Sequence, residues 1–361
     1  IMLLTRMVQL NQKKISSMSS FSNRIVKWYK NNGRHDLPWR KNISPYSIWI
    51  SEIMLQQTQV KTVVPYFNKF VEKYPNLDAL LKASEDEILA QWSGLGFYRR
   101  AKNIYKACRV ISEDFNSKLP TNINDLESLP GIGRSTAGAI MSIAFNEGHP
   151  ILDANVKRVL GRYKKISFKT ENEKQKKLWL ISEELTPNKE SFEYTQGIMD
   201  LGATHCSKST PSCDLCPVSN NCDSAFKEVS NKVSLRKAIQ KPTVKLNFIL
   251  PHTKNEILMH KKQASEYWES LWIPIDGDEL KIKGNQKYSK IKVNHPLSHL
   301  NLDMKIKTFK IDKKYDLDSN LEYKWIKKSK VDEYAMPTPI KKVVSTPVSY
   351  THLRAHETRH Y

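Results

Sequence analysis

Two carboxylates, Glu52 and Asp153, have sequence settings that could give them different protonation states. Glu52 is the only acid in the largely apolar segment 48–60. If it points inward, desolvation raises its pKa and makes it a proton donor near neutral pH; on the outer face it would be an ordinary solvated glutamate. The pattern alone leaves both open. Asp153 fits as a helix N-cap, where the helix dipole favours the ionised form. One protonated and one charged carboxyl is the arrangement that cleaves glycosidic bonds.

Four of the five cysteines lie within 17 positions, and these are Cys206, Cys213, Cys216 and Cys222. A disulfide framework would spread its cysteines over a small secreted domain, so this grouping indicates a metal site in a reducing compartment. Zinc ribbons usually use two CxxC pairs and only one is present, which favours a [4Fe–4S] cluster. Lys208 and its basic neighbours indicate that this loop also meets phosphate. The remaining Cys108 is interpreted as a core thiol.

Gly131 and Gly133 lie between two predicted helices, in LPGIGRSTA (129–137). Glycines permit a tight turn, and the first N–H groups of the next helix, with its dipole, can hold a DNA phosphate. An ordinary helix–helix turn is the alternative. Lys plus Arg outnumber Asp plus Glu by 58 to 37, a formal net charge of +21, which favours a polyanionic partner. No stretch approaches the roughly 20 apolar residues of a membrane span.

The elements that must position these residues are helical from about residue 21 to 226. Ser44 and Pro45 form a start signal, and short connections rich in Gly, Pro and Asn predict a compact all-α unit. Apolar residues recur at helical spacing from Phe21 to Tyr29, and the helix that Ser44 and Pro45 open runs through Met54. Further helices are predicted at 60–73, 84–92, 99–114, 124–128, 135–145, 155–163 and 174–185.

A second, smaller α+β domain is predicted beyond a polar, basic linker at 229–241. Short alternating segments predict its strands, at 244–250, 256–260, 304–310 and 323–327. Residues 1–17 are interpreted as translated upstream sequence, with Met18 as the natural start, and 348–361 as derived from a sequencing adapter. The two domains would then span 18–228 and 242–347.

The glycine hairpin, the aspartate 22 positions after Gly131 and the four-cysteine spacing together resemble the helix-hairpin-helix DNA glycosylases of the endonuclease III superfamily. Within it, several segments look closely like the MutY family of adenine glycosylases: 37–40, 51–60, 94–103, 129–140 and 151–162. The resemblance covers about residues 20–344. It implies a six-helix barrel with the hairpin at 41–150, an iron–sulfur subdomain from 18–40 and 151–228, and a MutT-like (Nudix-like) domain at 242–347.

The resemblance also implies roles for individual residues. Glu52 would protonate adenine N7 and later serve the attacking water, Asp153 would stabilise an oxocarbenium-like sugar, and Asn155 would support this chemistry. The adenine must be extruded, because its glycosidic bond cannot be reached inside the duplex. Further positions are implied for the wedge that enters the duplex (Leu55, Gln56, Gln57) and for the adenine pocket (Leu37, Trp39, Arg40, Gln196). Apart from the resemblance, Gly131 and Gly133 of the hairpin and Lys157 near Asp153 are expected to contact phosphate, with incidental trapping of the sugar aldehyde as the alternative for Lys157.

Ser135 occupies the position at which family members that also cleave the backbone carry a Schiff-base lysine. Serine cannot do that chemistry, so we expect a monofunctional glycosylase that leaves an abasic site. In the second domain, Ser298 and His299 match a loop that identifies 8-oxoguanine opposite the adenine. The stretch after Trp272 lacks the Glu-rich cluster of MutT hydrolases, so recognition is favoured over nucleotide hydrolysis.

Two departures from the family pattern stand out. Phe97 replaces the tyrosine that commonly wedges beside 8-oxoguanine, so the ring can stack but a hydroxyl contact is lost. Glu269 and Ser270 replace a familiar Gly-Gly, which puts a close backbone contact to phosphate in doubt.

The predicted function is excision of adenine from duplex DNA in which it faces 8-oxoguanine or guanine. Two alternatives remain, a sister glycosylase/lyase acting on oxidised pyrimidines and a non-catalytic iron–sulfur DNA-binding protein. A nucleotide hydrolase ranks behind both. We expect a monomer without membrane association, in the bacterial-type cytoplasm or nucleoid. The sequence does not indicate protein partners.

Overall fold

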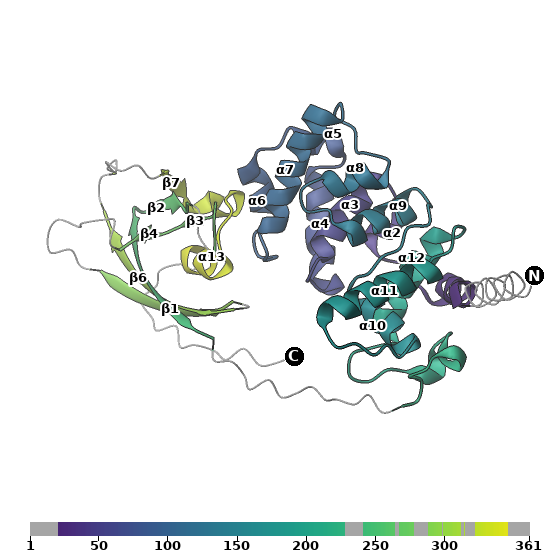
Figure 1. Cartoon of the computed structure of the whole chain (residues 1–361). Coiled ribbons are helices and arrows are strands. Elements are labelled where there is room, and N and C mark those ends of the chain that lie inside the picture. Colours follow the sequence, from purple (N-terminus) through teal and green to yellow (C-terminus); the bar gives the residue numbers. More distant parts are fainter. Residues whose placement is uncertain are drawn as a thin grey trace, which may run out of the picture. The chain divides into compact units, whose positions relative to one another are not determined.

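A computed structural model describes residues 21–227, 241–263, 267–277, 288–297, 299–311, 314 and 322–345. The chain divides into two compact units (Figure 1). The first unit comprises Ile1–Ser84 and Arg99–Ala238, and the second comprises Glu85–Tyr98 and Ile239–Tyr361. The predicted upstream segment 1–17, most of the linker 229–241, the adapter-like segment 348–361 and Ser298 lie outside the described residues. The domain bounds given above therefore stay a prediction.

The first unit is helical throughout its described part. Its helices are residues 21–32, α2 (Pro38–Lys41), α3 (Pro45–Leu55), α4 (Val60–Lys73), α5 (Leu77–Leu81), α7 (Arg99–Asp114), α8 (Ile123–Ser128), α9 (Arg134–Ala144), α10 (Ala154–Tyr163), α11 (Glu171–Leu185) and α12 (Ser191–Thr204). Two short 3₁₀ turns follow, η1 (Cys213–Leu215) and η2 (Ser219–Asn221). The prediction omitted α2, α5 and α12.

The boundaries of α3 have local causes at both ends. Ser44 caps its first turn in a reciprocal capping box with Ser47, and Pro45 occupies the first helical position. At the other end, the guanidinium of the buried Arg100 donates to the carbonyl oxygens of Ile53, Met54 and Gln56, at 3.1, 2.5 and 2.7 Å. These bonds satisfy carbonyls that the end of a helix leaves unpaired.

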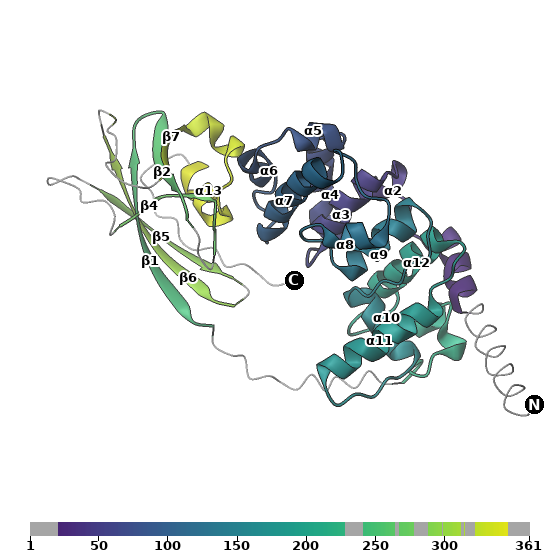
Figure 2. The ribbon, with the colours of Figure 1, turned by 45° about the horizontal axis from the view of Figure 1, so that its top comes forward.

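Four helices form the centre of the first unit. Helix α3 packs on α9, while α12 packs on both α9 and α10 (Figure 2). The approach of α12 to α10 is close: a Cβ atom at Gly202 would lie 2.6 Å from Cβ of Asn155. Glycine therefore serves helix packing here. The same residue type lowers helix propensity, and α12 contains two glycines, which is why its sequence gives a weak helical signal.

The second unit is built on a seven-stranded mixed sheet in its described part. The strands are β1 (Thr243–His252), β2 (Glu256–Lys261), β3 (Trp272–Ile273), β4 (Ile275–Asp276), β5 (Ser289–Pro296), β6 (Asn301–Lys310) and β7 (Tyr323–Lys327). The central order is β3-β2-β1-β6-β5, with β4 paired to β1 and β7 paired to β2. Strands β1 and β6 run parallel, and the other pairs are antiparallel.

An apolar core lies between this sheet and the C-terminal elements η3 (Lys328–Glu333) and α13 (Thr338–Ser345). It joins Phe248, Met259 and Met304 of the strands to Met336 and Ile340. Helix α6 (Glu85–Gln91) contacts η3 and belongs to this unit. All four predicted strands are present. The expected fold class is confirmed, with a helical domain followed by a smaller domain built on a sheet.

Candidate functional site

A cavity of about 690 Å³ in the first unit is lined from α2, α3, α9, α10 and α12. Eleven of the residues singled out by sequence meet there, namely Leu37, Trp39, Arg40, Glu52, Leu55, Gln56, Gln57, Ser135, Asp153, Asn155 and Gln196. Lys208 of the cysteine loop reaches the same cavity. Segments more than a hundred residues apart in the sequence thus contribute to one site.

The Glu52 side chain faces this cavity from the buried helix α3, so the solvated outer-face alternative does not hold. Burial is the main cause that raises its pKa, to about 7. The negative charge of Asp153 raises it further, while the positive charge of Arg40 opposes the rise. A carboxyl in this setting keeps its proton close to neutral pH and can donate it to a bound group.

Asp153 is the N-cap of α10, and its Oδ1 accepts a hydrogen bond from the Val156 N–H at 2.7 Å. The sequence led us to expect a carboxyl held ionised by the helix terminus. Burial instead raises its pKa, and hydrogen bonds from Val156 and Asn155, with the charge of Arg158, only partly offset that rise. Glu52 and Asp153 titrate as an interacting pair. Asp153 has the donors that stabilise a negative charge, so we assign the retained proton to Glu52.

Ser135 and the glycine hairpin lie beside this pair. Gly131 has φ +85°, and a Cβ atom there would lie 2.8 Å from Cβ of Asn103, so the turn requires glycine. Gly133 caps α9 without a side-chain hydrogen bond, which leaves its first N–H groups available to an anion. Ser135 Oγ accepts a hydrogen bond from the Leu152 N–H at 2.9 Å. The serine thereby fixes the backbone just before Asp153.

A buried charge network that sequence reasoning missed supports the cavity wall. Asp200, on α12, has no exposed side-chain surface and accepts hydrogen bonds from both Arg34 and Arg40. Burial favours a raised pKa for Asp200, but the hydrogen bonds and charges of the two arginines outweigh it and lower the pKa. Asp200 therefore keeps Arg40 in place, and Arg40 in turn moderates the pKa of Glu52. The signal that could have identified Asp200 from the sequence is the same as for Glu52, an acidic residue among apolar residues of a helix.

Arg158 was also missed, and it connects the cavity to the cysteine loop. Its guanidinium donates to Asn155 Oδ1 at 2.8 Å, to the Cys206 carbonyl at 2.6 Å and to the Gly202 carbonyl at 2.5 Å. One turn further along α10, Arg162 donates to Cys206 Sγ at 3.3 Å and to the Ser207 carbonyl at 2.6 Å. Helix α10 therefore carries Asp153 at its start and holds the cysteine loop along its side.

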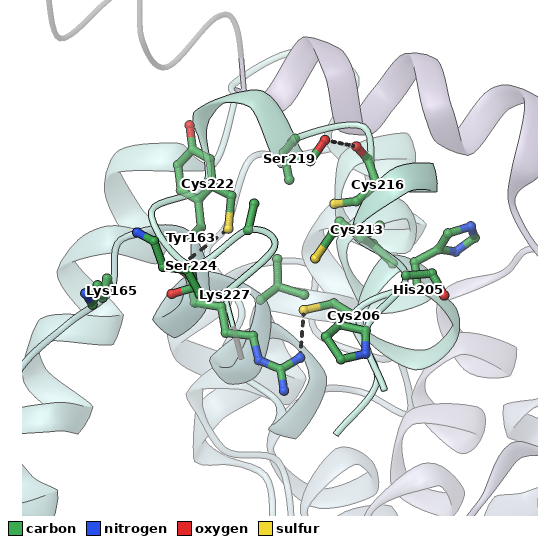
Figure 3. A pocket seen from close by; sticks show the side chains of 17 residues that line it. Tyr163, Lys165, His205, Cys206, Cys213, Cys216, Ser219, Cys222, Ser224 and Lys227 are labelled. Carbon is green, nitrogen blue, oxygen red and sulfur yellow. Dashed lines mark hydrogen bonds between the residues drawn. The ribbon is translucent and has the colours of Figure 1, made fainter. Parts of the chain in front are cut away.

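The four clustered cysteines line a second cavity of about 380 Å³, and their side chains point into it (Figure 3). Cys213 begins η1, Cys216 follows it, and Cys222 follows η2. Burial is the main cause that raises the pKa of Cys216, to about 11, and that of Cys222. Within the described residues, no three His, Cys, Asp or Glu side chains lie close enough to share one metal ion.

Several predicted residues do not line the first cavity. Lys157 is on α10 but is not among the residues that line the cavity. Gly131 does not line it either, but its carbonyl oxygen accepts a hydrogen bond at 3.3 Å from Nε2 of Gln56, which does. Phe97 and His299 belong to the second unit and are both exposed. Among the described residues, no helix combines the length and apolar character needed to cross a membrane.

Comparison with known proteins defines the class. Residues 50–184 match the family model of HhH-GPD superfamily base excision DNA repair proteins, and residues 247–346 match that of the NUDIX domain. The solved structure of a thermostable thymine-DNA glycosylase is 31% identical, with a TM-score of 0.53, over 60% of this chain and 98% of that one. The helical unit is therefore that of the HhH-GPD superfamily of base excision DNA repair proteins.

Two relatives narrow the class. An adenine DNA glycosylase of Buchnera aphidicola subsp. Schizaphis graminum is 43% identical over 77% of this chain and 81% of its own length. Another, of Buchnera aphidicola subsp. Baizongia pistaciae, is 38% identical over 90% of this chain and 96% of its own length. The chain belongs to the adenine DNA glycosylase family.

Proposed function

We propose that this chain is a monofunctional glycosylase that hydrolyses the bond between adenine and its sugar where adenine faces 8-oxoguanine or guanine. The observation that carries the proposal is that Glu52 and Asp153 line the same cavity, since the pKa of Glu52 is raised to about 7 and Asp153 has hydrogen-bond donors for its charged form. The cavity is large enough for a flipped-out base.

The chemistry proceeds in two balanced steps. Glu52 donates its proton to N7 of the extruded adenine, and the bond between N9 and the sugar C1′ breaks with its electron pair going to the base. The ionised Asp153 stabilises the positive charge that develops on the sugar. Water then attacks C1′ and gives a proton to the Glu52 carboxylate, which regenerates the acid.

Ser135 supports the absence of a lyase step. A Schiff base with the sugar requires an amine, and the hydroxyl at this position already accepts a hydrogen bond from the Leu152 N–H. The expected product is an abasic site in an intact strand. Strand breaks should form only after treatment with hot alkali.

We further propose that the cavity lined by Cys206, Cys213, Cys216 and Cys222 holds a [4Fe–4S] cluster. The donor set suits it, because such clusters are bound by four cysteine thiolates, and the cavity of about 380 Å³ exceeds the needs of a single ion. When bound, the cluster would supply a rigid core for a loop with little regular structure. The Arg162 guanidinium, which donates to Cys206 Sγ at 3.3 Å, would hold this ligand in place on the loop.

The second domain would read the base opposite the adenine. The exposed His299 lies between β5 and β6, while its predicted partner Ser298 lies outside the described residues. Of the two residues that replace the Gly-Gly pair, Ser270 has φ +64°, a backbone conformation that favours glycine.

The direct test uses purified protein and duplexes with one adenine opposite 8-oxoguanine, guanine or thymine. We expect adenine release from the first two and an intact strand with an abasic site. Release of an oxidised pyrimidine instead would refute the substrate assignment. Iron and visible absorbance are measured on the same sample, and stoichiometric zinc without iron would refute the cluster.

A further inference from the structure

One backbone carbonyl of the second unit accepts two side-chain hydrogen bonds from the segment that follows α6. Ser93 Oγ donates to the Met336 oxygen at 3.1 Å, and Tyr98 Oη donates to the same oxygen at 3.0 Å. Met336 is fully buried in the core between the sheet and α13. The acceptor therefore belongs to a residue of the buried core of the C-terminal domain.

The segment Ser93–Tyr98 is also closed on itself. The Gly94 N–H donates to Tyr98 Oη at 3.2 Å, so this hydroxyl accepts one hydrogen bond and donates another. Trp92 Nε1 donates to the Gly96 carbonyl at 3.1 Å. At the start of α6, Asp86 Oδ1 lies 2.6 Å from Lys261 Nζ of β2. The helix that precedes the segment is thus attached to the sheet as well.

This closed loop presents Phe97. The residue has φ +50° and its side chain is 48% exposed, which is unusual for a large apolar residue. A ring held outward on a closed loop is suited to stack on a nucleic-acid base. Two residues beyond Tyr98, Arg100 bonds the carbonyl oxygens at the end of α3, the helix of Glu52. A few residues of chain therefore join the loop to the catalytic helix.

We propose that Ser93 and Tyr98 are positioning residues that lock the Phe97 loop to the C-terminal domain through the Met336 carbonyl. When the C-terminal domain binds the base opposite adenine, the Phe97 ring would then be held at a fixed position relative to that base for insertion into the duplex. The inference rests on the proposed function, because it takes the C-terminal domain to read that base. Its consequence is that affinity for the recognised mispair depends on two hydroxyl groups that need not touch DNA.

The test compares Tyr98→Phe, Ser93→Ala and the double variant with wild type, using Tyr105→Phe on α7 as the matched loss of a tyrosine hydroxyl. Dissociation constants are measured on duplexes with a non-cleavable 2′-fluoro-adenosine opposite 8-oxoguanine or thymine. The double variant should bind the 8-oxoguanine duplex at least about tenfold more weakly, since it loses three hydrogen bonds. Its affinity for the thymine duplex and its single-turnover rate at saturating enzyme should stay within about twofold.

A second readout needs no DNA. Hydrogen exchange at the Gly94 amide should accelerate in Tyr98→Phe and stay unchanged in Tyr105→Phe, because only Tyr98 accepts this hydrogen bond. Ser93→Thr, which keeps a hydroxyl, should restore the affinity lost in Ser93→Ala.

The outcomes separate the two proposals. If the wild-type protein releases no adenine opposite 8-oxoguanine, the proposed function is refuted. Hydrogen exchange at the Gly94 amide still tests whether Tyr98 holds the Phe97 loop, because it needs no DNA. Unchanged Gly94 exchange, unchanged affinity for the 8-oxoguanine duplex, or equal weakening on both duplexes overturns the positioning role of Ser93 and Tyr98.

Discussion

Replacing Glu52 by glutamine should stabilise the protein at alkaline pH while removing its activity. The folded state raises the pKa of Glu52 from 4.5 to about 7, so it binds this proton more tightly than the unfolded chain does. Stability is therefore lost as pH rises through that window. Each unit of pKa corresponds to about 1.4 kcal/mol. Because the cavity admits water and Asp153 contributes part of the rise, we expect a gain of about 1–3 kcal/mol at pH 8.

The assay is urea unfolding of wild type and Glu52→Gln at pH 5 and pH 8, followed by tryptophan fluorescence. The stability advantage of the variant should be small at pH 5, close to the lower end of the window between 4.5 and about 7, and larger at pH 8, above the window. Glu127→Gln, at an exposed position on α8, is the control and should change neither midpoint. If the difference in urea midpoint between Glu52→Gln and wild type is no larger at pH 8 than at pH 5, the argument that burial raises the pKa of Glu52 is refuted.

Three further outcomes follow from the same structure. The single-turnover rate should fall above about pH 7, because Glu52 loses its proton there. It should also fall in acid, because Asp153, whose pKa is raised as well, gains a proton. A rate that does not change from pH 5 to 9 would contradict the assigned roles. Asp200→Asn leaves two arginines without their buried partner and should destabilise the fold by about 3–5 kcal/mol; an unchanged urea midpoint would show that the network is dispensable. Ser270→Gly relieves a side chain from φ +64° and should raise the stability of the second unit by up to about 1 kcal/mol, with a lowered unfolding temperature as the contrary result.

Helix positions were predictable where local signals agreed. Ser44 with Pro45, and Asp153 ahead of an apolar-periodic stretch, start helices within a residue of the predicted place. Helix α12 was missed because its two glycines and mixed composition weaken the local signal, and its stability comes from packing on α9 and α10. The parallel pairing of β1 with β6 joins residues 58 positions apart, such as Thr243 and Asn301, which no local pattern encodes.

For the candidate site, too, some features were predictable from the sequence and others were not. The resemblance supplied residues that do gather at one cavity, but the protonation of Glu52 stayed open until its surroundings were known. For Asp153 the sequence indicated only the cap, which lowers the pKa, and not the burial that outweighs it. Asp200 and Arg158 were missed because their partners, Arg34 and the Cys206 carbonyl, lie far away in the sequence.

The central claim is that Glu52 and Asp153 together cleave the bond between adenine and its sugar. The most direct test is adenine release under single-turnover conditions from a duplex with adenine opposite 8-oxoguanine, using wild type, Glu52→Gln and Asp153→Asn. We predict release by wild type, and loss of at least about a hundredfold in rate for each variant with duplex binding retained. Wild-type turnover by either variant would contradict the account.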